Sequence, residues 1–170
     1  MVNLETTYMG LKLKNPIIVG SSGLTNSVEN IIQIEKNGAA AVVLKSLFEE
    51  QIKHAASNTI VQNEFGNTYP EAEDYIRNYT RENDVANYLQ LIRESKKAVK
   101  IPIIASINCI SDTEWITFAK QIEDAGADAL ELNVFILPSD PNHDAEQNEA
   151  IYFNIVQKVL EVVKIPVALK

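Results

Sequence analysis

Short runs of apolar residues recur along the chain, and each run leads into polar residues. The clearest run covers residues 40–44, where every position is apolar until Lys45 and Ser46 follow. Consecutive apolar residues suit a strand that is buried on both faces, as in a parallel sheet covered by helices. The runs that predict strands are residues 17–19, 40–44, 103–105, 129–135 and 167–170.

The segments between these runs carry apolar residues at helical spacing. Residues 28–32 follow the i, i+3, i+4 pattern before Gly38, and residues 115–122 repeat it before Gly126. Glycine after the last periodic residue is typical of a helix end, because it adopts the left-handed conformation readily. The predicted helices cover residues 27–38, 84–97, 111–126 and 146–163.

The order of the predicted elements indicates the fold class. A lysine followed two positions later by proline and then by apolar residues occurs at 14–18, 100–104 and 164–168. Such repetition of strands and helices indicates successive right-handed βαβ units. Five parallel strands and four crossovers predict an α/β fold of the TIM type, a (β/α)8 barrel of which this chain is the amino-terminal half. A doubly wound open sheet is the alternative.

The chain is expected to form a single partial barrel domain over residues 1–170. Residues 4–14 alternate loosely around Met9 and predict a small capping β-hairpin. Residues 47–83 are long and polar, which predicts a lid-like insertion after the second strand. A complete barrel takes about 250 residues, so we expect a truncated chain or half of a larger protein. A homodimer, or pairing with the missing barrel half, would cover the edge of the last strand.

Composition narrows the classes of partner and the compartment. The formal net charge is −8, without a Lys/Arg cluster, which argues against nucleic acid and against an anionic membrane surface. The lone Cys109 excludes an internal disulfide, and no apolar segment approaches the length of a membrane span. We therefore expect a cytoplasmic protein that acts on a small-molecule substrate.

Polar side chains follow the predicted strands at their carboxyl ends, which meet at one rim of a parallel barrel. These residues are Ser21, Ser22, Lys45, Ser46, Ser106, Asn108, Asn133 and Lys170. Ammonium, amide and hydroxyl donors suit a planar ligand that has several carbonyl oxygens and gains negative charge. A flavin fits this description, because hydride arrival at N5 places negative charge on the N1 and O2 side of the ring.

Five short motifs occur in an order that is typical of a known family. They are residues 15–18 with the following Ser-Gly turn, then 44–46, 106–108, 131–133 and 167–170. Together they resemble the dihydroorotate dehydrogenase family, nearest its class 1 members, over essentially all 170 residues. The resemblance implies an FMN-dependent (β/α)8 barrel that oxidises dihydroorotate to orotate in pyrimidine biosynthesis in the cytosol.

The resemblance also implies roles for individual residues. The cofactor contacts that it implies are Ser21, Ser22, Lys45, Ser46, Asn108, Asn133 and Lys170. Lys45 would lie beside both the flavin ring and the reacting substrate and act as the catalytic residue, and Lys170 would stabilise the reduced ring near N1. Asn63 and Asn67, in the lid-like insertion, would bind the substrate. FMN would bind weakly or not at all to these 170 residues, because the family's phosphate loops follow the fifth strand.

One position departs from the family pattern and leaves the substrate open. The class 1 members carry a cysteine base three residues after the asparagine that Asn133 matches, and this chain has Ile136 there. Cys109 is interpreted as a quiet, partly buried thiol rather than a replacement base. Dihydroorotate is the substrate implied by the resemblance, and a divergent family member with another substrate is the alternative.

Two other functions are compatible with the same residues. Lys45 or Lys170 could form a Schiff base in a lyase or aldolase barrel that uses no flavin. The chain could also be a non-enzymatic partial barrel that pairs with itself or with a partner. No metal site is predicted, because the acidic clusters have no spacing that matches a metal-binding loop.

Overall fold

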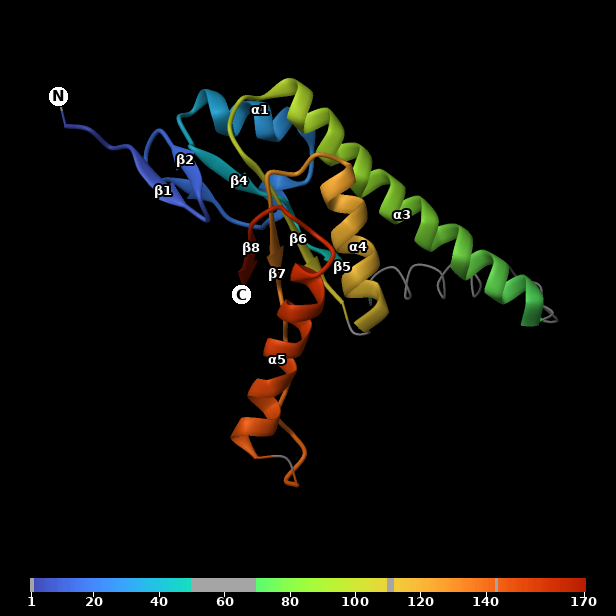
Figure 1. Ribbon diagram of the computed structural model, residues 1–170. Helices are drawn as coiled ribbons and strands as arrows, with labels where there is room; N and C mark the ends of the chain where they lie inside the picture. The colour runs from blue at the N-terminus through green and yellow to red at the C-terminus, as the bar shows by residue number, and fades with distance from the viewer. Residues whose placement is uncertain (1, 50–69, 110–111, 143) are drawn as a thin grey trace.

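The computed structural model describes residues 2–49, 70–109, 112–142 and 144–170 (Figure 1). Its main sheet has the order β3-β4-β6-β7-β8, and every neighbouring pair is parallel. A short strand, β5, pairs with β6 beyond the end of β4. The strands are β3 (Ile18–Val19), β4 (Ala41–Val43), β5 (Leu47–Phe48), β6 (Ile103–Asn108), β7 (Ala129–Leu132) and β8 (Val167–Leu169).

The helices connect successive strands and cover one face of this sheet (Figure 1). They are α1 (Val28–Lys36), α3 (Pro70–Ala98), α4 (Asp112–Asp124) and α5 (Ala145–Leu160). Alternate strand residues such as Val42 and Ile103 are buried in one cluster with Ile31, Ile92 and Trp115 from the helices. A doubly wound sheet carries helices on both faces, so this one-sided arrangement confirms the predicted partial barrel.

A small hairpin covers the opposite face of the sheet. β1 (Thr6–Tyr8) pairs antiparallel with β2 (Leu11–Leu13), as the alternation in residues 4–14 predicts. Leu13 is buried with Val43, Ile104 and Ala129 in a second, smaller core cluster. These strand residues point toward the barrel interior, so the hairpin closes the part of the interior beside β4, β6 and β7.

The helix α3 is longer than the sequence pattern predicts. Residues 47–83 are expected to form a lid-like insertion; at its ends Leu47–Phe48 form β5 and the helix begins at Pro70, and residues 50–69 lie outside the described residues. Proline suits the first turn of a helix, because its missing N–H would have no intrahelical partner there. Residues 71–98 contain neither glycine nor proline. The helix that was predicted to begin at Asp84 can therefore extend back to Pro70 without interruption.

A carboxylate at the end of one helix binds the start of a later strand, and this contact occurs twice. Glu35 Oε1 accepts hydrogen bonds from the N–H groups of Lys100 at 2.7 Å and Ile101 at 3.1 Å. Glu123 Oε1 accepts in the same way from Lys164 at 2.6 Å and from the next N–H at 3.2 Å. Each glutamate thereby satisfies two backbone donors just before the proline that opens a strand.

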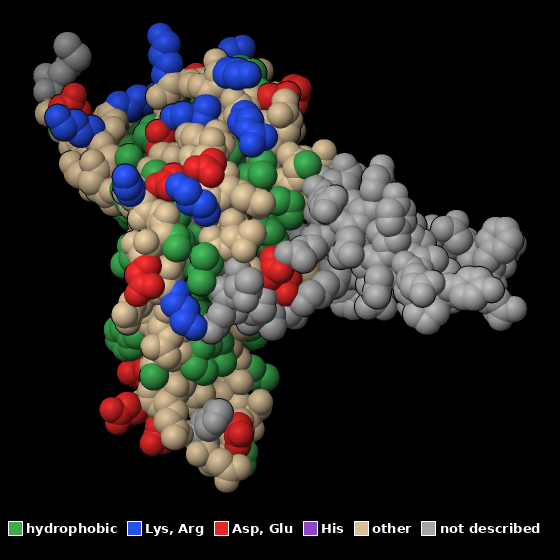
Figure 2. All heavy atoms as spheres, turned by 45° about the vertical axis from the view of Figure 1, so that its right-hand side comes forward, with side chains coloured by type: hydrophobic (Ala, Val, Ile, Leu, Met, Phe, Trp, Pro, Cys, Tyr) green, Lys and Arg blue, Asp and Glu red, His purple; other side chains and the backbone are tan. Residues whose placement is uncertain are grey.

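The two helices that supply these glutamates also end alike. Gly38 and Gly126 lie three residues after the two glutamates, and both have φ of +94°. This left-handed conformation favours glycine, as the sequence predicts for the end of the first helix. On the face drawn in Figure 2, most of the basic side chains of the described residues lie in the upper part among acidic ones, and acidic side chains alone lie at the lower end.

Candidate functional site

Five polar side chains form a continuous hydrogen-bonded series at the carboxyl ends of the strands. The Oγ atoms of Ser21 and Ser46 lie 3.1 Å apart, and those of Ser46 and Ser106 lie 2.7 Å apart. Ser106 Oγ donates to Glu131 Oε1 at 2.9 Å, and Lys170 Nζ donates to the same oxygen at 3.2 Å. We call these five residues the polar chain. It joins β3, β4, β6, β7 and β8 on the interior face.

An extra residue between β4 and β5 brings Ser46 into this polar chain. Val43 pairs with Ile104 and Leu47 pairs with Ile107, so four steps along one strand match three along the other. An insertion of one residue is a β-bulge, and it changes the face to which the following side chains point. Ser46 therefore lies beside Ser106 on the interior face.

The bulge also interrupts the backbone ladder at Ser106, where Tyr88 takes its place. Tyr88 lies on α3, and its hydroxyl accepts from the Ser106 N–H at 2.9 Å and donates to the Ser106 carbonyl at 3.0 Å. Burial raises the pKa of Tyr88 well above its ordinary value, and the nearby carboxylate of Glu131 raises it further. The phenol therefore stays neutral and remains a hydrogen-bond donor.

Lys45, predicted as the catalytic residue, lies outside the polar chain. Its side chain is exposed and lines a cavity of about 420 Å³ together with Asp84, Asn87 and Tyr88 from α3. Its backbone N–H donates to the Thr25 carbonyl at 3.3 Å. The two lysines that were predicted to share one rim therefore have different surroundings, because Lys170 contacts Glu131 and Lys45 faces α3.

Three other predicted site residues need separate mention. Ser22 is exposed and caps the short helix η1 (Gly23–Thr25), where its Oγ accepts from the Leu24 N–H at 3.3 Å. The side chain of Ser22 therefore has a structural partner, whereas Ser21 belongs to the polar chain. Asn63 and Asn67 lie outside the residues that the structure describes.

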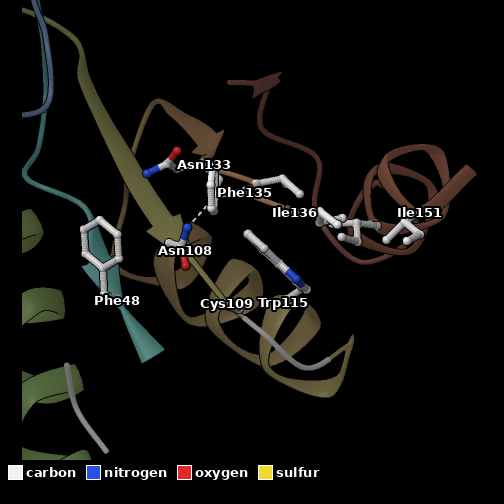
Figure 3. A pocket seen from close by; sticks show the side chains of 10 residues that line it. Phe48, Asn108, Cys109, Trp115, Asn133, Phe135, Ile136 and Ile151 are labelled. Atoms are coloured by element: carbon white, nitrogen blue, oxygen red, sulfur yellow. Dashed lines mark hydrogen bonds between the residues drawn. The ribbon is translucent and has the colours of Figure 1, made fainter. Parts of the chain in front are cut away.

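A second cavity, of about 670 Å³, opens at the carboxyl ends of β6 and β7; we call it the rim pocket. Asn108 and Asn133 line it, and Asn108 Nδ2 donates to the Asn133 carbonyl at 2.7 Å. Trp115 from α4 and Ile151 from α5 supply apolar wall, and Ile136 lies beside them (Figure 3). The two predicted amide residues thus lie together at the edge of an apolar pocket.

Sequence reasoning missed two residues that organise this region. Glu131 receives hydrogen bonds from two members of the polar chain, although the sequence marks it only as part of the motif at residues 131–133. A carboxylate between Leu130 and Leu132, both fully buried, is a signal that could have singled it out. Tyr88 could not have been found in this way, because its apolar helical spacing is equally typical of a core residue.

Comparison with known proteins identifies the family. The family model described as Dihydroorotate dehydrogenase matches residues 3–170. The chain belongs to the dihydroorotate dehydrogenase family. This confirms the resemblance that the five strand-end motifs indicate.

Several curated relatives carry dehydrogenase names. The catalytic subunit of dihydroorotate dehydrogenase B (NAD(+)) from Thermoplasma acidophilum is 28% identical over 134 residues, which cover 79% of this chain and 42% of that protein. The same subunit from Thermoplasma volcanium is 28% identical over 183 residues, covering 100% of this chain and 54% of the relative. The NAD-dependent dihydropyrimidine dehydrogenase subunit PreA of Escherichia coli K12 is 25% identical over 164 residues, which cover 95% of this chain and 39% of that protein. The chain thus spans about half the length of these relatives.

Solved structures support the fold alone. A putative dihydrodipicolinate synthetase from Pseudomonas aeruginosa superposes with a TM-score of 0.52 at 16% identity, over 90% of this chain and 44% of that one. An IMP dehydrogenase/GMP reductase-like protein from Corynebacterium glutamicum gives a TM-score of 0.50 at 14% identity, over 99% and 43%. In each case the chain matches less than half of the larger structure.

The hydrogen-bond donors at the carboxyl ends of the strands fit a flavin. The polar chain ends in an ammonium group, and the rim pocket adds two amides, so both kinds of donor meet at the carboxyl ends of the strands. Among the described residues, no group of three or more His, Cys, Asp or Glu could hold a metal ion. Within the same ranges, no helix has the length and apolarity that a membrane span requires.

Proposed function

We propose that the protein is an FMN-dependent oxidoreductase that transfers hydride between a carbon of a small cyclic substrate and N5 of the flavin. The observation that carries this proposal is the polar chain, which ends in the Lys170–Glu131 pair on the interior face. Bound FMN would supply the redox chemistry, and its ring gains negative charge on the N1 and O2 side when it is reduced. A cation restrained at this rim suits that charge.

The residues of the chain have distinct roles in this proposal. Lys170 would bind the edge of the flavin that gains charge, and Glu131 would hold the ammonium in place. Asn108 and Asn133 would donate hydrogen bonds to the flavin or the substrate, and Ser21 would approach the ring from the first turn. Ser22, Lys45 and Ser46 remain proposed cofactor contacts from the family motifs, and Lys45 remains the proposed catalytic residue, although its side chain lines the cavity beside α3 and the Ser22 side chain caps η1. Asn63 and Asn67 remain proposed substrate ligands.

Dihydroorotate is the first substrate to test, because several relatives are named dihydroorotate dehydrogenases. On that assignment the whole protein would act in cytoplasmic pyrimidine biosynthesis. Ile136 stands where the family motif carries the cysteine base, and it cannot accept a proton. We therefore keep another small cyclic substrate as the alternative. The lysine-dependent lyase gains no support from the dihydrodipicolinate synthetase likeness, since 16% identity carries no function.

Absorbance and bleaching of the full-length protein test the proposal. We expect flavin bands in the purified protein and their loss under anaerobic conditions when a substrate is added. Lys170→Met should weaken FMN binding about tenfold, which corresponds to about 1.4 kcal/mol, and Lys97→Met on the exposed end of α3 serves as the control. A colourless full-length protein that ignores added FMN would overturn the flavin assignment. We also propose a homodimer as one way to cover the edge of β8, and size-exclusion chromatography on dilution tests it.

A further inference from the structure

Glu131 adds a carboxylate to the polar chain, beside the one cation of that chain. Its side chain is 15% exposed, and its Oε1 lies 3.2 Å from Lys170 Nζ. The other three members of the polar chain are neutral hydroxyls. The polar chain therefore presents a paired positive and negative charge, with no net charge, to a ligand at the carboxyl ends of the strands.

The hydrogen bonds of the polar chain all run toward Glu131. Ser106 Oγ gives its single proton to the carboxylate, so it accepts in its 2.7 Å contact with Ser46. Ser46 has then used its own proton, and it accepts from Ser21 in the 3.1 Å contact. Successive donors polarise one another toward the last oxygen, which suits an ionised carboxylate.

The last of these donors is itself held in place. Ser106 is fully buried, and its N–H and carbonyl both bond to the Tyr88 hydroxyl, at 2.9 and 3.0 Å. The carboxylate of Glu131 is thus fixed from the buried side. Lys170 is 49% exposed, and its ammonium takes its position from that carboxylate.

The carboxylate also changes what the cation can do for a neighbouring ring. A ring that gains negative charge is attracted by the ammonium of Lys170 and repelled by the carboxylate of Glu131 beside it. The two effects oppose each other, and the ammonium lies nearer to the solvent-accessible side. Reduction of the ring is therefore favoured less than an isolated ammonium would favour it.

We propose that Glu131 is a positioning residue that fixes the Lys170 ammonium and offsets part of its charge, and that it thereby lowers the reduction potential of the bound flavin. This inference rests on the proposed function, because it requires FMN beside Lys170. A lower potential makes the reduced flavin a stronger reductant and eases its reoxidation. Glu131 acts through Lys170 and through the field of its own charge, and it takes no part in the transfer of hydride.

Anaerobic redox titration of the full-length protein with bound FMN, against an indicator dye of known potential, tests the proposal. Glu131→Gln removes the negative charge and keeps an oxygen that accepts from Lys170. We expect the equilibrium constant for flavin reduction to rise about tenfold, which corresponds to a potential about 30 mV higher. Glu149→Gln, exposed on α5, removes the same charge outside the polar chain and should leave the potential unchanged. An unchanged or lower potential in Glu131→Gln overturns the proposal.

The affinities of the two flavin forms separate this effect from a loss of structure. Anaerobic titration of the flavin-free protein should show that Glu131→Gln binds reduced FMN about tenfold more tightly, whereas its affinity for oxidised FMN changes by less than about threefold. A residue with only a structural role would affect both forms alike. Equal weakening of both forms therefore overturns the proposal.

A second variant keeps the proposal testable if Glu131→Gln does not fold. Ser106→Ala removes one of the two donors to Glu131 Oε1, so more of the carboxylate's charge acts on Lys170. The reduction constant should then fall by about twofold or more, and a rise or no change overturns the proposal. A native protein that binds no FMN overturns the proposed function together with this inference. FMN that binds to each variant with the native potential overturns this inference alone.

Discussion

The carboxylate of Glu131 lies 3.2 Å from the ammonium of Lys170, and the same oxygen accepts from Ser106 at 2.9 Å. One oxygen atom thus links three neighbouring strands, β6, β7 and β8. Because Glu131 is mostly buried and Lys170 is half-exposed, the carboxylate is the fixed member of the pair. The position of the Lys170 ammonium therefore depends on Glu131 of the neighbouring strand β7.

Removing both charges of this pair should reveal a modest coupling. In a double-mutant cycle with Glu131→Gln and Lys170→Met, we expect a coupling energy of about 0.5–1 kcal/mol, because the ammonium is partly screened by water. Urea unfolding of the four proteins measures it. A coupling energy above about 2 kcal/mol would mean that the pair behaves as a buried one.

Two fully buried serines provide a matched test of the polar chain. Ser106→Ala removes a hydroxyl that bonds to both Ser46 and Glu131, so it should lower the free energy of unfolding by about 1–3 kcal/mol. Ser95→Ala removes a buried hydroxyl with no hydrogen-bond partner among the described residues, and its effect should stay within about 0.5 kcal/mol. Similar losses in the two variants, measured by urea unfolding, would contradict the importance of the chain.

The raised pKa of Tyr88 predicts a loss of stability in alkaline solution. Below the unfolded pKa near 10 the phenol is neutral in both states, and its contribution is fully present. As the pH rises above 10, only the unfolded state ionises, so stability falls by about 1.4 kcal/mol per pH unit. Tyr88→Phe should lower stability by about 1–3 kcal/mol at pH 8.

Above pH 10 the difference in stability between the native protein and Tyr88→Phe should become smaller, because the variant lacks the titrating phenol. Urea unfolding at pH 8 and pH 10.5 measures both effects. Tyr8→Phe, at an exposed position of β1, is the control and should follow the native protein at both values. A gap between native protein and Tyr88→Phe that stays constant with pH would show that Tyr88 does not titrate as the structure indicates.

The contact of Glu123 with the start of β8 predicts the opposite dependence in acid. A hydrogen bond from Lys120 and two backbone N–H groups lower the pKa of Glu123. Stability from this carboxylate is therefore present above its unfolded pKa of about 4.5 and is lost as the pH falls through the lower folded value. Glu123→Gln should reduce the loss of unfolding free energy between pH 6 and pH 3, measured by urea unfolding. Glu149→Gln, exposed on α5, should leave it unchanged.

Position 126, after α4, has a left-handed backbone conformation that favours glycine over other residues. Gly126 has φ of +94°, and nothing lies within 4 Å of an added Cβ, so Gly126→Ala should cost about 1 kcal/mol through backbone conformation alone. Gly20 has open space and no positive φ, so Gly20→Ala should be neutral or slightly stabilising. Thermal unfolding of both variants checks the difference.

The apolar runs and the repeated prolines are local features of the sequence. They were sufficient to predict successive parallel strands and the partial barrel. The surroundings of Lys45 could not be predicted from them. Register is set by the partner strand, and the single residue inserted between Val43 and Leu47 is visible only when β6 lies beside them. The partner of Lys170 was missed for a similar reason, since Glu131 lies 39 residues away in sequence.

The paired helix-to-strand contacts of Glu35 and Glu123 bear on the order in which the protein assembles. Each contact joins a helix to the strand that follows the next helix, so it closes a segment whose residues are all already synthesised. The first can form on the ribosome before β7 is translated, and the second repeats the step with the next unit. The barrel wall can therefore grow from its amino terminus in two steps, each closed when a glutamate binds the start of the later strand.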